Sequence, residues 1–172
     1  NKIIEGEGNF REKGEYDLVI VDEAHNFRGA TAGRYDDLQL ICKTPRINEG
    51  LVKGHHKKVM LLSATPLNNR PIDLLNLLLL FQNARYSTIE GIQNLPVTFS
   101  PWIEEYDKLM RERKLDKHNE RNAEFAKRTD DLYEKIRTQV IDKVTVRRTR
   151  NNIKNVPAYK KDLDDQHLVC RL

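Results

Sequence analysis

Two short apolar runs in the first part of the chain predict β-strands. They occupy residues 17–21 and 58–62, and the first is rich in β-branched residues. Continuous runs of this length are typical of strands buried on both faces, as in a parallel sheet with helices above and below. Between them, apolar residues recur at helical spacing over residues 31–42 and predict a crossover helix. Strand, helix and strand form a βαβ unit.

A buried helix is predicted next, over residues 72–81, which are nearly all apolar. Asn68 and Asn69 offer an amide as the helix cap, and Pro71 suits the first helical turn because its missing N–H is not needed there. Asn76 interrupts the longest apolar stretch, which falls well short of the roughly 20 residues that span a bilayer. We expect this stretch to be core and the chain to make no membrane contact.

The second half of the chain changes character. Residues 82–101 contain Gly91, Pro96 and Pro101, and we expect them to be irregular. Neither Pro nor Gly occurs between Pro101 and Pro157, which favours two long helices, with a helical hairpin as one arrangement. Four apolar residues there repeat at every fourth position among charges of both signs and predict an amphipathic face: Leu132, Ile136, Val140 and Val144.

We therefore expect an α/β fold with three parts: a parallel-sheet domain over residues 1–100, a charged helical protrusion over 101–146, and a linker over 147–172. Lys and Arg number 30 against 26 Asp and Glu, a net charge of +4, and 33% of the residues are charged. This balance fits a solvated, salt-bridged helical surface and only weakly favours a polyanionic partner.

Cys42 and Cys170 lie far apart and fit neither a disulfide framework nor a cysteine zinc site. A reducing, intracellular setting is expected. The compact protrusion favours a bacterial or phage origin and hence a cytoplasmic location, and a eukaryotic protein would be nuclear. The chain begins with Asn1, and its candidate functional residues lie in its first third. We therefore expect it to be a piece of a longer protein.

The candidate catalytic and binding residues follow the two predicted strands. Asp22 and Glu23 come directly after the first strand, at the edge of a parallel sheet where α/β proteins bind ligands. One carboxylate there can hold Mg²⁺ and the other can activate a water molecule. Two carboxylates after a strand can also be an ordinary polar turn. Small hydroxyl residues, Ser63 and Thr65, follow the second strand and could bond to the acidic pair.

Three ordered segments resemble motifs of superfamily 2 nucleic-acid motors. Asp22-Glu23-Ala24-His25 resembles helicase motif II, and Ser63-Ala64-Thr65 resembles motif III. The continuation Pro66-Leu67-Asn68-Asn69 is similar to the Swi2/Snf2 branch, whose members translocate on double-stranded DNA. Residues 146–153, with three arginines, resemble the segment that joins the two motor lobes. A charged helical insertion before that segment is also a family feature.

The resemblance implies a partial RecA-like lobe of a P-loop NTPase that uses ATP and Mg²⁺. Asp22 would hold the metal through water and Glu23 would be the general base. His25, Ser63 and Thr65 would couple nucleotide state to movement. Arg147, Arg148 and Arg150 would contact double-stranded DNA, although arginines at a helix end also serve structural roles between lobes. The family amide matches Asn69, whose role stays open.

No Gly-x-x-x-x-Gly-Lys-Ser/Thr phosphate loop occurs in the chain. We therefore expect the isolated chain not to hydrolyse ATP, and its natural partners to be an N-terminal phosphate-loop segment and a C-terminal RecA-like lobe. The incomplete sheet would expose strand edges that invite self-association. Two alternatives stay open: a non-catalytic nucleic-acid-binding or protein-interaction subunit derived from a helicase lobe, and an RNA helicase.

Overall fold

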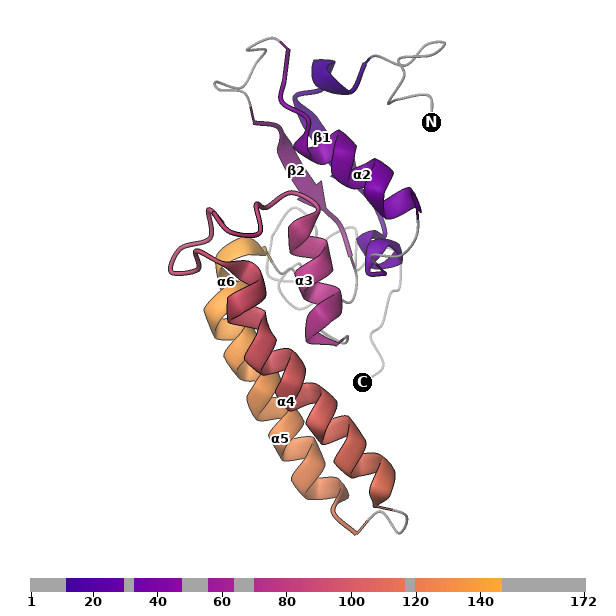
Figure 1. Cartoon of the computed structure of the whole chain (residues 1–172), viewed down its shortest axis with the longest axis vertical. Coiled ribbons are helices and arrows are strands. Elements are labelled where there is room, and N and C mark those ends of the chain that lie inside the picture. The colour runs from indigo at the N-terminus through magenta and orange to yellow at the C-terminus, as the bar shows by residue number, and fades with distance from the viewer. Residues whose placement is uncertain (1–11, 30–32, 48–55, 64–69, 117–119, 147–172) are drawn as a thin grey trace, which may run out of the picture.

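The computed structural model describes residues 12–29, 33–47, 56–63, 70–116 and 120–146. It is a mixed α/β chain in which a small βαβ unit and a long pair of helices lie at opposite ends (Figure 1). The helix α3, Pro71–Leu79, lies between these two parts. No helix among the described ranges has both the length and the apolar character that crossing a bilayer requires.

The predicted βαβ unit is confirmed. Strands β1, Leu18–Val21, and β2, Lys58–Leu61, pair in parallel, with Leu18 opposite Lys58 and Ile20 opposite Met60. The crossover helix is α2, Gly33–Lys43. Short 3-10 turns precede and follow β1, at Lys13–Glu15 and Ala24–Phe27.

The expectation that both faces of the strands are buried is wrong for the described part of the chain. Val21 is buried, and Val19 and Leu61 pack with it against residues of α2 and α3. On the other face, Ile20 and Met60 are 56% and 50% exposed. A continuous apolar run predicts a strand but does not reveal how many layers cover it, and the described helices pack on one face of this sheet.

Helix α3 begins as expected at Pro71, whose missing N–H falls in the first turn. The residue at the N-cap is Arg70, and its side chain makes no cap hydrogen bond, so the expected amide cap is not found there. Asn68 and Asn69 lie outside the described residues. The helix packs into two clusters, because Leu77 joins the core of the βαβ unit while Leu74 and Leu78 join the core of the long helices.

The expectation of irregular structure throughout residues 82–101 is wrong at its end, because α4 spans Leu95–Leu115. Asn94 caps this helix by accepting a hydrogen bond from the Val97 N–H at 3.1 Å. Pro96 lies in the first turn, where no donor is needed, and Pro101 lies inside the helix. Capping and burial of the apolar face therefore outweigh the two prolines that suggested a loop.

The predicted helical hairpin is confirmed. Helix α5, Asn122–Ile136, packs along α4 (Figure 1) and continues through a π-helical segment, Arg137–Ile141, into the short α6, Asp142–Val144. Of the four residues at fourfold spacing, Leu132, Ile136 and Val140 are buried, as expected, and Val144 is exposed. The spacing of apolar residues thus identified the buried face as far as the π-helical segment and failed at Val144, which follows it.

The π-helical segment changes which residues face the core. Consecutive residues Val140 and Ile141 are both buried, because the wider turn inserts one extra residue between inward-facing positions. Just beyond, the Lys143 ammonium donates a hydrogen bond to the Glu90 carbonyl at 2.7 Å. This contact ties the end of the hairpin to the turn that precedes α4, where Gly91 has φ of +75°.

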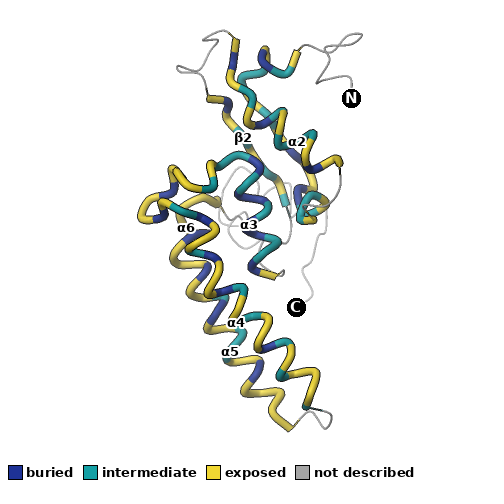
Figure 2. The backbone as a smooth tube through the Cα atoms, in the orientation of Figure 1, coloured by how far each residue is buried: buried dark blue, intermediate teal, exposed yellow. Residues whose placement is uncertain are grey.

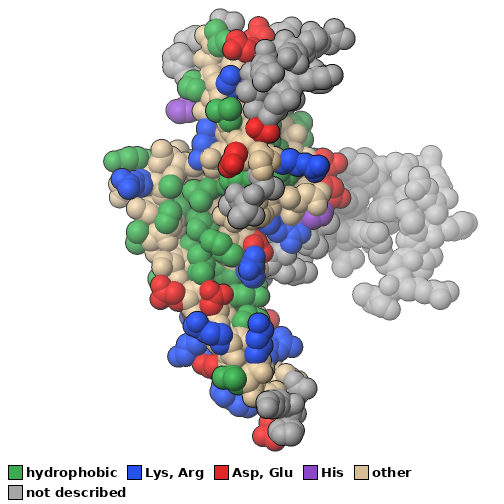
Figure 3. All heavy atoms as spheres, turned by 45° about the vertical axis from the view of Figure 1, so that its right-hand side comes forward, with side chains coloured by type: hydrophobic (Ala, Val, Ile, Leu, Met, Phe, Trp, Pro, Cys, Tyr) green, Lys and Arg blue, Asp and Glu red, His purple; other side chains and the backbone are tan. Residues whose placement is uncertain are grey.

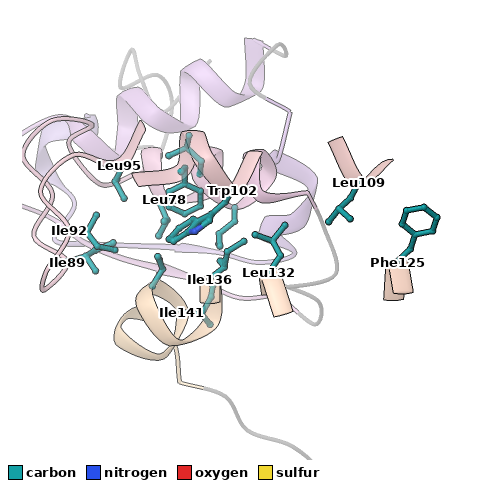
Figure 4. Close-up of a cluster of buried hydrophobic side chains, with 14 residues drawn as sticks. Leu78, Ile89, Ile92, Leu95, Trp102, Leu109, Phe125, Leu132, Ile136 and Ile141 are labelled. Atoms are coloured by element: carbon teal, nitrogen blue, oxygen red, sulfur yellow. The ribbon is translucent and has the colours of Figure 1, made fainter. Parts of the chain in front are cut away.

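Most of the core lies where the hairpin meets α3, and the hairpin becomes more exposed toward its tip (Figure 2). Trp102 lies in the middle of this cluster (Figure 4), with its ring edge-on to Phe99 at 5.0 Å between centroids. Tyr106 packs against Tyr133 of α5. The sequence-based interpretation of Trp102 and Tyr106 as packing anchors at the foot of the protrusion is confirmed.

Candidate functional site

The acidic pair lies at the carboxyl end of β1. Asp22 and Glu23 follow the last strand residue, Val21, and both are exposed. One oxygen of the Asp22 carboxylate, Oδ1, accepts a hydrogen bond from the Glu23 N–H at 2.8 Å. This bond holds Oδ1 against the backbone. The second carboxylate oxygen, Oδ2, can still accept hydrogen bonds or bind a cation.

Glu23 has a left-handed backbone, with φ of 47° and ψ of 46°. It has the only positive φ at a non-glycine position among the described residues. For an L-residue this conformation costs roughly 1–2 kcal/mol, because Cβ crowds the following carbonyl. Strain of this kind is often found at functional sites, where the surrounding structure maintains it. Here it turns the chain sharply from β1 into the 3-10 turn at Ala24–Phe27.

Backbone hydrogen bonds join the two strand ends that carry the sequence motifs. The Leu62 N–H donates to the Val21 carbonyl at 2.8 Å, and the Ala24 N–H donates to the Leu62 carbonyl at 2.9 Å. Ser63, the next residue, is half-buried. The expected approach of the acidic segment and the start of the hydroxyl segment is therefore present in the structure. The pairing shifts by one residue at this point, because Ala24 donates to the Leu62 carbonyl while the Glu23 N–H bonds to Asp22.

His25 turns back toward Glu23. Its ring atom Nδ1 lies 2.9 Å from the Glu23 carboxylate oxygen Oε2, with side-chain exposures of 30% and 57%. The Nδ1 atom has no hydrogen-bond partner among the described residues, and the two side chains form an ion pair when the imidazole is protonated. His25 thus lies beside the candidate general base, within the segment that the resemblance assigns to coupling.

Contacts with α2 and α3 hold the turn that carries this site in place. Ala24 is buried in the core of the βαβ unit. The Asn76 amide of α3 donates to the Arg28 carbonyl at 2.7 Å, and the Tyr35 hydroxyl of α2 donates to the Asn76 carbonyl at 2.8 Å. Sequence reasoning assigned no role to Asn76, although a single amide inside an otherwise apolar helix was the signal that it served a buried polar group.

A shallow hollow of about 370 Å³ adjoins the same turn. Its walls come from the end of the 3-10 turn and the start of α2, and they are Asn26, Phe27, Gly29, Gly33, Arg34 and Tyr35. The hollow combines an aromatic surface with one cation. Tyr35, which forms one of these walls, also bonds to Asn76 through its hydroxyl group, so the hollow adjoins the residues that anchor the turn after the acidic pair.

One carboxylate of this site is available to hold a magnesium ion. Among the described residues no three or more His, Cys, Asp or Glu side chains gather as a metal cage. Mg²⁺ does not need one, because it keeps several waters and is bound by one or two carboxylates together with substrate phosphates. The exposed Asp22, with Oδ2 outside the hydrogen bond to Glu23, fits that mode of binding.

Several predicted site residues lie outside the described part of the chain. They are Thr65, Asn69, Arg147, Arg148 and Arg150. Of the site predicted from sequence, the structure brings together Asp22, Glu23 and His25, with Ser63 on the neighbouring strand end.

The other candidate groups have ordinary roles. His56 is exposed, as expected for a solvated loop, and His55 lies outside the described residues. Cys42 is buried, and burial raises the pKa of its thiol to about 11, so the group is a thiol and not the more reactive thiolate near neutral pH.

The hairpin surface carries charges of both signs side by side (Figure 3). The Arg128 guanidinium lies 2.8 Å from a Glu112 carboxylate oxygen of the facing helix, and this hydrogen bond lowers the pKa of that carboxyl group. The expected salt-bridged helical surface is therefore found for these residues.

Comparison with known protein families, curated proteins and solved structures finds no significant match to this chain.

Proposed function

We propose that the chain is part of the first RecA-like lobe of a Swi2/Snf2-type motor, in which ATP hydrolysis drives movement along double-stranded DNA. The resemblance of three ordered sequence segments motivates the proposal. One structural observation supports it most directly: the hydrogen bond from the Ala24 N–H to the Leu62 carbonyl, which joins the acidic segment to the strand end that begins the Ser63 segment. Neighbouring carboxyl ends of parallel strands are where α/β proteins bind nucleotides.

Each residue has a role that its geometry permits. Asp22 would hold magnesium, and the metal would neutralise the charge of the phosphates when it is bound. Glu23, exposed at the sharp turn, orients the attacking water and takes its proton. His25 lies against Glu23 and so can transmit a change in that carboxylate to the rest of the turn.

The proposal assigns the phosphate loop and the second lobe to a longer protein. The 172 residues contain no phosphate-loop motif, so we expect the isolated chain to show no ATP turnover above background. Steady turnover by the isolated chain that disappears with Glu23→Gln would contradict this division of the site.

The decisive experiment measures ATP turnover by the full-length gene product without nucleic acid, with duplex DNA and with RNA. Glu23→Gln should reduce duplex-stimulated turnover by about 10²–10⁴-fold, because it removes the general base and keeps the size of the side chain. The matched control is Glu120→Gln, an exposed carboxylate beside the hairpin loop, which should leave the rate unchanged.

The same assay distinguishes the alternatives. Stimulation by RNA in preference to duplex DNA would replace the DNA motor with an RNA helicase. A folded full-length protein with no turnover under any condition would leave the non-catalytic binding subunit as the function.

A further inference from the structure

A short turn connects the acidic pair to α3. Glu23 precedes the 3-10 turn Ala24–Phe27, and Arg28 follows it. Within the turn, the Asn26 N–H donates a hydrogen bond to the Glu23 carbonyl at 2.9 Å. A four-residue turn with an internal hydrogen bond of this kind is a compact unit, so a contact at its Arg28 end also affects the position of Glu23.

Asn76 of α3 holds the Arg28 end of this turn. Its side-chain amide, Nδ2, donates to the Arg28 carbonyl at 2.7 Å. The backbone carbonyl of Asn76 accepts a hydrogen bond at 2.8 Å from the hydroxyl of Tyr35, a buried residue of α2. Two hydrogen bonds therefore lead from α2 through α3 to the turn. Helix α3 is itself held by both cores, with Leu77 in one and Leu78 in the other.

Glu23 needs this support, because its left-handed backbone is unfavourable by itself. Strained residues persist only where the surrounding structure maintains them. The cost of a left-handed L-residue is comparable with the net contribution of one hydrogen bond to stability. Release of the Arg28 carbonyl therefore allows Glu23 to relax toward a negative φ, and the direction of its carboxylate changes with the backbone.

We propose that Asn76 is a positioning residue for Glu23, because its amide holds the turn at Arg28 and so fixes the direction of the Glu23 carboxylate. The effect on turnover rests on the proposed function, in which Glu23 is the general base. Asn76 acts through the backbone of the turn and contributes no group to the reaction. A misplacement of about 1 Å in a catalytic site can cost about 10²-fold in rate.

The first test uses the 172-residue chain and needs no catalysis. NMR coupling constants report the φ angle of Glu23, which should be positive in the wild-type chain and move toward negative values in Asn76→Asp. This variant keeps the size of the side chain, but its ionised carboxylate cannot donate to the Arg28 carbonyl. Tyr35→Phe removes the hydroxyl that holds the Asn76 carbonyl and should shift φ in the same direction by a smaller amount.

The matched control compares Asn76→Ala with Asn94→Ala. Each variant removes one asparagine side chain that bonds to the backbone, but Asn94 caps α4 in the hairpin. The φ of Glu23 should change in Asn76→Ala and stay positive in Asn94→Ala. A φ that remains positive in both Asn76 variants, or an equal shift in Asn94→Ala, would overturn the connection.

The second test measures duplex-stimulated ATP turnover by the full-length gene product, at a temperature where circular dichroism shows every variant folded. Asn76→Asp and Asn76→Ala should lower kcat by about tenfold or more and change KM for ATP by less than about twofold. Asn94→Ala should leave both constants unchanged. Equal losses of kcat in Asn76→Ala and Asn94→Ala, or a change confined to KM, would exclude a positioning role.

The two tests separate this inference from the proposed function. A folded wild-type protein without turnover contradicts the proposed function, and the φ of Glu23 then decides by itself whether Asn76 fixes the turn. Turnover that depends on Glu23 but is unaffected by the Asn76 variants supports the proposed function and overturns the inference.

Discussion

At the residue scale, Glu23 combines a candidate catalytic carboxylate with a strained backbone. Its left-handed conformation is one that glycine adopts without a steric penalty. Glu23→Gly should therefore stabilise the folded chain by about 0.5–1 kcal/mol, after the greater flexibility of glycine in the unfolded chain offsets part of the relief. Urea denaturation followed by circular dichroism measures the change.

The neighbouring carboxylate provides the control for this prediction. Asp22 has no positive φ, so Asp22→Gly gains no such relief and should destabilise the chain by about 0.5–1 kcal/mol. If both glycine variants shift the stability in the same direction, strain at Glu23 is not what separates the two positions. The sequence identified the acidic pair, but its backbone conformation depends on how β1 turns into the following residues.

At the element scale, the sequence predicted most of the secondary structure. Apolar runs identified both strands and α3, and fourfold spacing identified the buried face of α5. The start of α4 could not be predicted in this way, because Pro96 and Pro101 are usually signals of irregular structure. The exposed face of the sheet could not be predicted either, since an apolar run has the same appearance with one covered face or two.

Asn94 caps α4, and we expect this cap to stabilise the start of the helix. Asn94→Ala removes the acceptor of the Val97 N–H, and we expect a loss of about 1 kcal/mol in the free energy of unfolding. Asn94→Asp keeps an oxygen at the same position and should retain most of the stability. Thermal and urea unfolding of the three proteins measure the difference, and equal losses in both variants would exclude capping as the cause.

At the scale of the whole molecule, α3 joins two cores. One of its faces packs in the βαβ unit and another in the hairpin, and Asn76 bonds to the turn that follows the acidic pair. The sequence predicted α3 as core but not that it serves two clusters, because hydrophobicity along one helix does not identify the partners of each face.

Asn76→Ala should weaken the connection between the two parts. It leaves the Arg28 carbonyl without this donor, and we expect a loss of about 1–3 kcal/mol in stability. Amide hydrogen exchange should accelerate in β1, β2 and α2 more than in α4 and α5. Gln139→Ala, an exposed amide on the hairpin, should change stability by less than about 0.5 kcal/mol. Equal acceleration in both parts after Asn76→Ala would contradict a local connection.

The π-helical segment Arg137–Ile141 has a consequence for the direction of the polypeptide beyond it. One additional residue in a helix rotates everything downstream by about 100° relative to a regular α-helix. The extra residue buries Ile141 beside Val140 and allows Lys143 to reach the Glu90 carbonyl. The orientation of residues 142–146 is therefore set by the number of residues in this segment as well as by their type, and deleting one of them would rotate Lys143 away from the Glu90 carbonyl.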